Sequence, residues 1–452
     1  SIVVQTGRSL SVVRAYITLI SDVRLGSTQS SKMTTLAGKL MPKRDATPEV
    51  TITSIKDETR TMKSVQWFGT KDIRVVEVPV PKVTDEGDVI LRVTTTAICG
   101  SDLHFYNGAM PGMKKGDIVG HEFMGVVEAA GPNVKKFSVG DRVVVAFDIG
   151  CGSCFYCNKS QFSCCDSTNP SKEQEFLYGH NTAGLFGYSH MTGGWDGGQA
   201  EYARVPFADV NCLKVPEGMP DDKVIFLSDI MPTGWHGAEC GQVGEGDNVA
   251  IWGAGPVGLL AAQSCYVRGA AKVAIIDSEQ YRLDYAVAKL PGIHTVNFKE
   301  VKVLEALHKI FPVGPGPDVA IEAVGLHYAT SWLHKIEKAL MLETDPSEVL
   351  NEMIEATRKH GRISVIGAYA GYCNHFNIGA FMEKSMTMSG GQTPCQKYWP
   401  TLVKLMQEGK LDPTIVKTHE LPLEQAPEAY KMFDEKTDEV VKVVLKPALK
   451  GE

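Results

Sequence analysis

Two groups of residues in this sequence have the side chains and the spacing of metal ligands. In the first group, Cys99 ends an apolar run, and His121 lies on the far side of a glycine-rich loop. Zn²⁺ prefers soft and borderline ligands such as a thiolate and an imidazole. An isolated cysteine and histidine, however, are more often a buried thiol and a hydrogen-bonded core side chain. A catalytic metal site therefore needs support from other parts of the chain.

The second group is a cluster of cysteines on one short segment. Cys151, Cys154 and Cys157 are each separated by two residues, and Cys165 follows after seven more. Four thiolates on a loop suit tetrahedral zinc with no open coordination position, which is a structural site. Two disulfides are the alternative, and they are disfavoured in an intracellular chain. Cys164 directly precedes Cys165 and competes with it as the fourth ligand.

Asp229 can complete the first group. Its carboxylate is harder than a thiolate and donates less charge, which leaves zinc a stronger Lewis acid. With Cys99 and His121 it supplies three protein ligands and leaves a fourth position open, as in catalytic zinc sites. The alternative is that Asp229 caps the helix that follows it. We expect Glu122 to be an outer or alternating ligand, and Asp102 to hydrogen-bond the second ring nitrogen of His121.

A glycine-rich turn predicts a dinucleotide site. The turn lies between a buried strand, 247–252, and an apolar helix, and a second strand, 272–277, ends in Asp277. This is the arrangement of the dinucleotide fingerprint, in which the backbone approaches the pyrophosphate at the helix N-terminus. Asp277 would accept hydrogen bonds from the adenosine ribose and repel a 2′-phosphate, which favours NAD over NADP. The cofactor-binding residues of the turn are Gly253, Gly255, Pro256, Val257 and Gly258.

The elements that must position these groups fall into two kinds. Short alternating strands separated by turn residues predict a barrel-like β domain, with strands at 64–67, 73–77, 88–93, 120–128 and 139–145. From about residue 245, strands alternate with helices, which predicts a doubly wound parallel sheet. Its strands are 247–252, 272–277, 294–298, 318–322, 362–366 and 386–389. Helices at 398–408 and 423–433 and a strand at 439–445 complete the chain.

Composition limits the class of protein. The chain has 452 residues, of which 43% are hydrophobic and 22% charged, with a net charge of -7. These values are typical of a soluble protein and argue against a nucleic-acid surface, and no apolar run is long enough to cross a membrane. The eleven cysteines are clustered, which favours a reducing compartment and predicts a cytoplasmic protein. Residues 1–61 predict a poorly ordered extension, or sequence upstream of an initiator at Met33. The alternative is an Arg- and Ser-rich presequence, which would make the protein mitochondrial.

Together these motifs resemble the zinc-containing medium-chain alcohol dehydrogenases. The resemblance covers residues from about 62 to about 448 and rests on the Cys-x-Ser-Asp-x-x-His run from Cys99, the Gly-His-Glu run at 120–122, and the cysteine cluster. The segment 185–202 is similar to the glutathione-independent, formaldehyde-dehydrogenase-like branch. Aspartate serves as a zinc ligand in that branch where the general family has a second cysteine, and Asp229 occupies this position here.

The resemblance implies a GroES-like catalytic domain formed by 62–229 and 393–452, with a structural zinc lobe at about 150–166. A Rossmann NAD-binding domain would span 230–392. It also implies that an insertion near 335–358 shields the cofactor, and that the protein is a homodimer or homotetramer. Ser101 and His104 match a proton relay in which Ser101 touches the substrate oxygen and His104 lies near bulk solvent. The remaining cofactor residues implied are Thr233 and Val257 at the nicotinamide, Arg282 at the ribose and Lys442 near the pyrophosphate.

These parts predict an enzyme that uses two zinc ions and NAD. A zinc-bound alkoxide of a small alcohol or aldehyde hydrate would pass hydride to the nicotinamide, without nucleic-acid or membrane partners. One alternative is a polyol or amino-alcohol dehydrogenase of the same family. The other is a non-catalytic NAD-binding protein on this scaffold, which the intact ligands and glycine turn disfavour.

Overall fold

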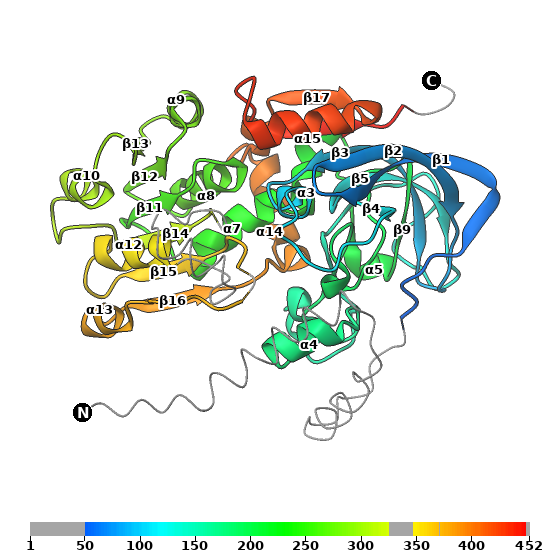
Figure 1. The fold of residues 1–452 in the computed structure, drawn as a ribbon, viewed down its shortest axis with the longest axis horizontal. Coiled ribbons are helices and arrows are strands. Elements are labelled where there is room, and N and C mark those ends of the chain that lie inside the picture. Colours follow the sequence, from blue (N-terminus) through cyan, green and yellow to red (C-terminus); the bar gives the residue numbers. More distant parts are fainter. Residues whose placement is uncertain (1–49, 325–346, 370, 449–452) are drawn as a thin grey trace.

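The structure is a computed structural model that describes residues 50–324, 347–369 and 371–448. Most of the predicted N-terminal extension and residues 335–346 of the predicted insertion lie outside these ranges. One half of the molecule is rich in β-strands and the other is built on a parallel sheet (Figure 1). Helices α7 (Ile230–Cys240) and α14 (Cys395–Gln407) pack against each other between the two halves.

The parallel sheet has six strands in the order β13-β12-β11-β14-β15-β16, and all of its pairs are parallel. Its central strands are runs of Val, Ala and Ile that are buried on both faces, as a sheet covered by helices requires. The strands are β11 (Asn248–Trp252), β12 (Lys272–Asp277), β13 (His294–Asn297), β14 (Val319–Glu322), β15 (Arg362–Val365) and β16 (Thr387–Gly390). The helices are α8 (Pro256–Val267), α9 (Gln280–Lys289), α10 (Val303–Ile310), α12 (Glu348–Ala356) and α13 (Ile378–Glu383). All six predicted strands are present, and the order places β11 beside the switch point where dinucleotides bind.

The β-rich half is built around β3 (Val89–Ile98), which pairs with β5, β9 and β18. The C-terminal strand β18 therefore returns to the sheet formed by the first part of the chain. The other strands of this half are β1 (Lys56–Gly69), β2 (Asp72–Pro81), β4 (Asp117–Ile118), β5 (Glu122–Ala130), β6 (Arg142–Val145), β7 (Asp148–Ile149), β8 (Gly184–Leu185), β9 (Tyr202–Val205), β10 (Cys212–Lys214), β17 (His419–Pro422) and β18 (Val443–Lys446).

Short helices connect these strands. They are α3 (Asp102–Tyr106), α4 (Lys172–Tyr178), α5 (Ala208–Asn211), α6 (Asp221–Val224) and α15 (Ala426–Glu435). Single 3₁₀ turns lie at Cys157–Lys159, Phe162–Cys164, His190–Thr192, Ile225–Ser228, Pro413–Val416 and Leu423–Gln425. Helix α4 begins where the Ser171 hydroxyl accepts a hydrogen bond from Gln174 N and ends at Gly179 in the left-handed region, so both ends are capped.

The sequence predicted that the folded part of the chain begins at Met62. In the structure it begins earlier. Strand β1 starts at Lys56, and Arg204 donates hydrogen bonds to the carbonyls of Thr51 and Ile52. Arg204 also forms a buried ion pair with Asp88 at 2.6 Å. The sequence did not predict this part of β1, because residues 56–61 are largely charged and show no hydrophobic alternation. This end of the strand is exposed, and its register with β2 is irregular.

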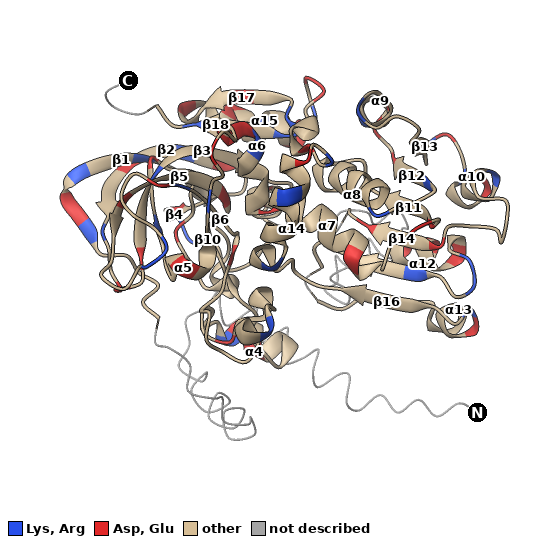
Figure 2. Cartoon of the chain, turned by 180° about the vertical axis from the view of Figure 1, so that it is seen from behind, with Lys and Arg blue, Asp and Glu red and all other residues tan. Residues whose placement is uncertain are grey.

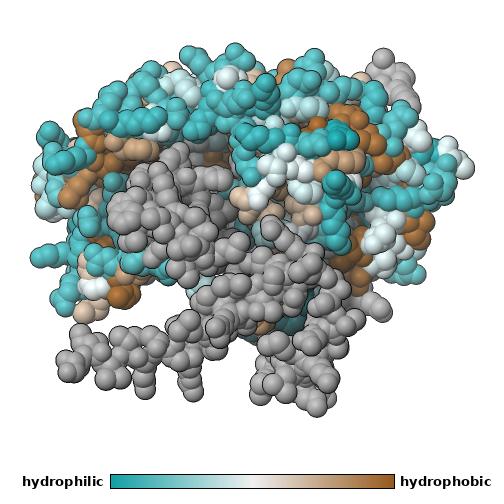
Figure 3. Space-filling model, in the orientation of Figure 1, coloured by the Kyte–Doolittle hydropathy of each residue, from teal (hydrophilic) through white to brown (hydrophobic). Residues whose placement is uncertain are grey.

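The surface carries both signs of charge. Acidic and basic residues are interspersed over both halves (Figure 2). The face in Figure 3 is mainly hydrophilic, with hydrophobic residues in separate patches. Within the described ranges, no helix is long and apolar enough to cross a membrane.

Candidate active site

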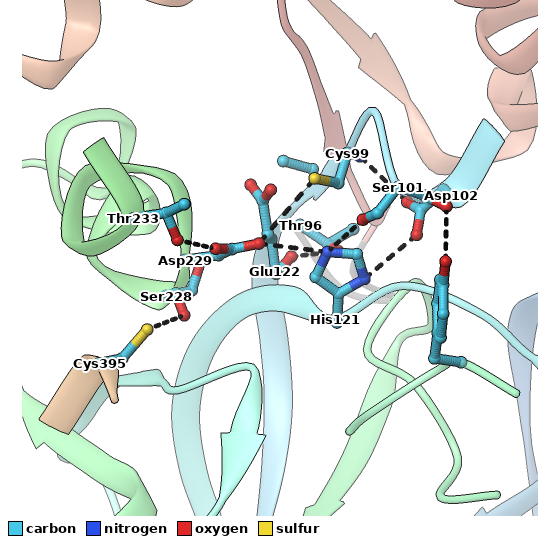
Figure 4. Close-up of polar contacts among 12 residues, drawn as sticks. Thr96, Cys99, Ser101, Asp102, His121, Glu122, Ser228, Asp229, Thr233 and Cys395 are labelled. Atoms are coloured by element: carbon cyan, nitrogen blue, oxygen red, sulfur yellow. Dashed lines mark hydrogen bonds and ion pairs between the residues drawn. The ribbon is translucent and has the colours of Figure 1, made fainter. Parts of the chain in front are cut away.

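Cys99, His121, Glu122 and Asp229 form one buried cluster. Each residue offers a ligand atom, and all four atoms lie within 4.8 Å of one another. Asp229 Oδ2 is 3.3 Å from His121 Nε2 and 3.9 Å from Cys99 Sγ. Tetrahedral ligands at zinc distances are separated by roughly 3.3–3.8 Å. The donor set and its spacing therefore fit a zinc ion held by Cys99, His121 and Asp229 (Figure 4).

Local backbone structure brings these three side chains together. Cys99 follows β3, where its N–H donates a hydrogen bond to Asp102 Oδ2 at 3.0 Å. His121 lies just before β5, and Asp229 lies between a 3₁₀ turn and α7. Thr233, one turn into α7, donates to Asp229 Oδ1 at 2.6 Å. This bond leaves the second carboxylate oxygen of Asp229 to face His121 and Cys99.

Neighbouring residues set the orientation of the His121 imidazole ring. Asp102 Oδ1 lies 3.1 Å from His121 Nδ1, and Ser101 Oγ lies 3.3 Å from Nε2. Phe147 and Tyr188 contact the imidazole edge-on, with centroid distances of 6.1 Å in both cases. A histidine that ligates a metal through Nε2 needs a partner such as Asp102 on its other nitrogen to set the tautomer.

Glu122 of this cluster forms a fully buried ion pair with Lys442. Lys442 Nζ is 2.6 Å from Glu122 Oε1, and neither side chain is exposed. The family resemblance implied a position for Lys442 near the cofactor pyrophosphate. Lys442 lines the cavity, and its ammonium group lies against Glu122, where it stabilises the charged form of the buried carboxylate. The second oxygen, Glu122 Oε2, has no hydrogen-bond partner in the described part of the chain.

Burial is the largest single influence on the pKa of each of the four cluster residues. It raises the pKa of Cys99 and of Glu122, and Lys442 opposes both shifts. For His121 burial lowers the pKa, but Asp102 and Asp229 outweigh it, so the pKa lies well above its usual value. For Asp229 burial raises the pKa, but hydrogen bonding to His121 reverses the shift and leaves the pKa lowered. A metal cation satisfies the same negative groups, and its binding displaces protons from the thiol and the imidazole.

The four cysteines of the second group also lie together. Cys151, Cys154, Cys157 and Cys165 are buried, and their sulfur atoms lie within 4.8 Å of one another. The Cys151–Cys157 and Cys154–Cys165 sulfur distances are each 3.9 Å, too long for disulfides and suited to a shared ion. All eleven cysteines of the sequence lie in the described part of the chain and are free thiols. Cys164 is exposed and is not a member of this cluster.

The glycine turn and the first cluster line one cavity of about 1950 Å³. Cys99, His121 and Asp229 line one part of it, and Gly253 and Gly255 line another. Helix α8 begins directly after Gly255, with Pro256 in its first turn. A Cβ atom at Gly258 would lie 1.9 Å from the Gly253 carbonyl oxygen, so a glycine is required where helix and strand pack.

Comparison with known proteins agrees with this geometry. The family model of the alcohol dehydrogenase GroES-like domain matches residues 85–217. A zinc-type alcohol dehydrogenase-like protein of Schizosaccharomyces pombe is 41% identical over 389 residues, which cover 85% of this chain and 90% of the relative. The chain belongs to the zinc-type alcohol dehydrogenase-like family.

Two further relatives of this alcohol dehydrogenase-like protein are informative. A glutathione-independent formaldehyde dehydrogenase of Pseudomonas aeruginosa is 34% identical over 395 residues, covering 82% of this chain and 94% of the relative. The solved alcohol dehydrogenase of Thermus sp. ATN1 superposes with a TM-score of 0.72 at 34% identity, covering 86% of this chain and 100% of that structure. The predicted combination of a GroES-like domain and a Rossmann sheet is confirmed. The family is one of oxidoreductases.

The predicted dinucleotide residues lie where the cavity reaches the parallel sheet. Val257, Thr233, Asp277 and Arg282 all line it. Asp277 accepts hydrogen bonds from the backbone N–H groups of Ala254 at 2.8 Å, Ser278 at 2.7 Å and Glu279 at 3.0 Å. This carboxylate therefore also ties the glycine turn to the end of β12.

His104 departs from its expected place. The family resemblance implied a position near bulk solvent, but the residue is 5% exposed and lines the cavity from α3. The reason is that α3 packs beneath the C-terminal helix α15. Phe147 and Tyr188 were not identified from the sequence as site residues. The only feature of the sequence that could have indicated Phe147 is its position between β6 and the cysteine cluster.

Proposed function

We propose that the protein is an NAD-dependent dehydrogenase that transfers hydride between a small alcohol or aldehyde hydrate and NAD. The observation that carries this proposal is the single cavity lined by both the three-ligand cluster and the glycine turn. A zinc ion held by Cys99, His121 and Asp229 would supply Lewis acidity to a substrate hydroxyl, and the nicotinamide of NAD would accept the hydride. A second zinc ion in the cysteine cluster would stabilise its lobe.

The side chains around the cluster orient the substrate and move its proton. Ser101 Oγ, 3.3 Å from His121 Nε2, is placed to accept the hydroxyl proton of a substrate at the cluster. His104 lines the same cavity, and it would take up the proton that Ser101 releases and pass it to water in the cavity. Phe147 and Tyr188 cover the His121 ring and exclude water from this end of the cavity. Val257 and Thr233 line the same cavity and would contact the nicotinamide.

The relatives suggest which substrates to test first. The Pseudomonas aeruginosa relative is named a glutathione-independent formaldehyde dehydrogenase. Asp229 supports the same assignment, because an aspartate ligand is the feature in which this chain resembles that branch. We therefore propose formaldehyde, as its hydrate, and short primary alcohols as substrates. We also propose a homodimer or homotetramer, which light scattering after size exclusion would test.

The experiment combines metal analysis with NADH formation. The purified protein should contain two zinc ions per chain and reduce NAD with at least one member of a panel of formaldehyde, primary alcohols and polyols. Cys99→Ala should lose one zinc and the activity. Cys212→Ala is a matched control, because Cys212 is also a buried thiol but lies in neither cluster.

Two results would separate the alternatives. Activity with polyols alone would favour a polyol dehydrogenase of the same family. Tight binding of NAD by zinc-loaded protein without NADH formation on any substrate would favour a non-catalytic binding protein, and the proposal would then be wrong.

A further inference from the structure

A chain of buried polar side chains connects His121 to the C-terminal helix α15. Asp102 lies 3.1 Å from His121 Nδ1, and its other oxygen, Oδ2, accepts a hydrogen bond from Gln199 Nε2 at 3.4 Å. Gln199 Oε1 in turn accepts a hydrogen bond from the Tyr430 hydroxyl at 3.0 Å. Asp102, Gln199 and Tyr430 are all completely buried.

The hydrogen bonds allow the Gln199 amide only one orientation. Its Nε2 donates to the Ala97 carbonyl at 3.1 Å and to Asp102 Oδ2, so both amide protons have acceptors. Its carbonyl oxygen is left for Tyr430, which can donate. If the amide were turned over, its oxygen would face the Ala97 carbonyl and the Asp102 carboxylate, and its N–H groups would face the Tyr430 hydroxyl. The Ala97 carbonyl and the Asp102 carboxylate, which can only accept, therefore select the orientation in which Gln199 donates to Asp102, and the Tyr430 hydroxyl donates to the amide oxygen that remains.

The backbone holds Gln199 against the residues that precede His121. Gln199 N donates to the Val119 carbonyl at 3.1 Å, and Gly198 N donates to the Gly120 carbonyl at 2.8 Å. A Cβ atom at Gly120 would lie 2.3 Å from Gln199 Cγ, and Gly120 has a φ of +94°. A glycine directly before His121 therefore makes room for the Gln199 side chain.

We propose that Gln199 and Tyr430 are positioning residues of the metal site, which set its affinity through Asp102 and His121. Cys99 N and Gln199 Nε2 both donate to Asp102 Oδ2, so the carboxylate is held with Oδ1 toward His121 Nδ1. The opposite ring nitrogen then faces Asp229. This inference rests on the proposed zinc site at Cys99, His121 and Asp229.

The test is the zinc affinity of Tyr430→Phe, measured by competition with a chromogenic chelator. This substitution removes one hydroxyl and leaves the ring packed against Phe105 and Tyr106. Removing an outer partner of a ligating histidine typically weakens metal binding by about 10–100-fold. We expect a dissociation constant about tenfold higher at this site and no change at the cysteine cluster, which is an internal reference in the same chain. The visible absorption of cobalt bound at this site should also shift.

Further variants separate positioning from general destabilisation. Gln199→Leu should weaken zinc binding at least as much as Tyr430→Phe, and the double variant should be no weaker than Gln199→Leu alone, because Tyr430 acts through Gln199. Tyr106→Phe is the matched control, since it removes a hydroxyl from the same aromatic group outside the chain of hydrogen bonds. It should leave both zinc affinities unchanged.

Three outcomes would overturn the inference: unchanged zinc affinity in Tyr430→Phe, equal weakening of both zinc sites, or additive losses in the double variant. Wild-type protein that holds zinc only at the cysteine cluster would instead contradict the proposed function. The Cys99→Ala protein, which keeps only that cluster, supplies the reference affinity for this distinction.

Discussion

Replacement of Asp148 by asparagine should stabilise the protein, and the gain should grow as pH rises. Asp148 begins β7 and is completely buried. Burial is the largest influence on its carboxylate, and the smaller, opposing influences are the backbone N–H groups of Asp148 and Cys395 and the Gln396 side chain. Burial raises the pKa of Asp148 to about 8, because the surroundings penalise the charged form. Asparagine has nearly the same shape and no charge to bury.

The sign and size of the change in the free energy of unfolding with pH follow from this pKa. The folded state holds the proton more tightly than the unfolded state, in which the pKa is near 3.8. The free energy of unfolding therefore falls as pH rises between these two values, with a limiting slope of about 1.4 kcal/mol per pH unit. Between about pH 6 and pH 8, the wild type should lose roughly 2 kcal/mol that the variant retains.

Urea unfolding of zinc-loaded protein at fixed free zinc measures this difference. Asp284→Asn on α9 is the control, because it makes the same chemical change at an exposed carboxylate and should show no such pH-dependent gain. A difference between Asp148→Asn and wild type that stays flat or shrinks from about pH 6 to pH 8 would refute the reasoning. It would mean that Asp148 is already ionised at neutral pH in the folded protein.

Three further predictions concern the metal clusters. Ser101→Ala should lower turnover by about 100-fold or more without changing zinc content, and unaltered turnover would exclude Ser101 from proton transfer. Cys154→Ala should release one zinc per chain and lower the unfolding temperature, whereas Cys164→Ala should do neither; equal zinc loss would contradict the ligand set. Lys442→Met should lower the free energy of unfolding by about 3–5 kcal/mol, because it leaves the Glu122 carboxylate buried without a cation. Adding Glu122→Gln should recover much of this loss, and a cost for Lys442→Met below about 1 kcal/mol would show that the pair is solvated.

The sequence by itself determined the chemistry that this chain can support. Spacing alone identified the cysteine cluster, because four thiolates on one short loop have few other uses, whereas Cys99 and His121 were identified only together with the other motifs of the chain. The glycine turn and the six strands were also readable, since local periodicity and glycine placement depend on neighbouring residues alone.

Only the tertiary structure decided which distant residues share a site. Asp229 could have been a helix cap until the fold placed its carboxylate 3.3 Å from His121. Lys442 pairs with Glu122, and Tyr430 reaches Asp102 through Gln199, across sequence separations that no local pattern records. The physical reason is that buried charges and amides must find partners wherever the packed chain brings them, and those partners are set by the packing of β18 and α15.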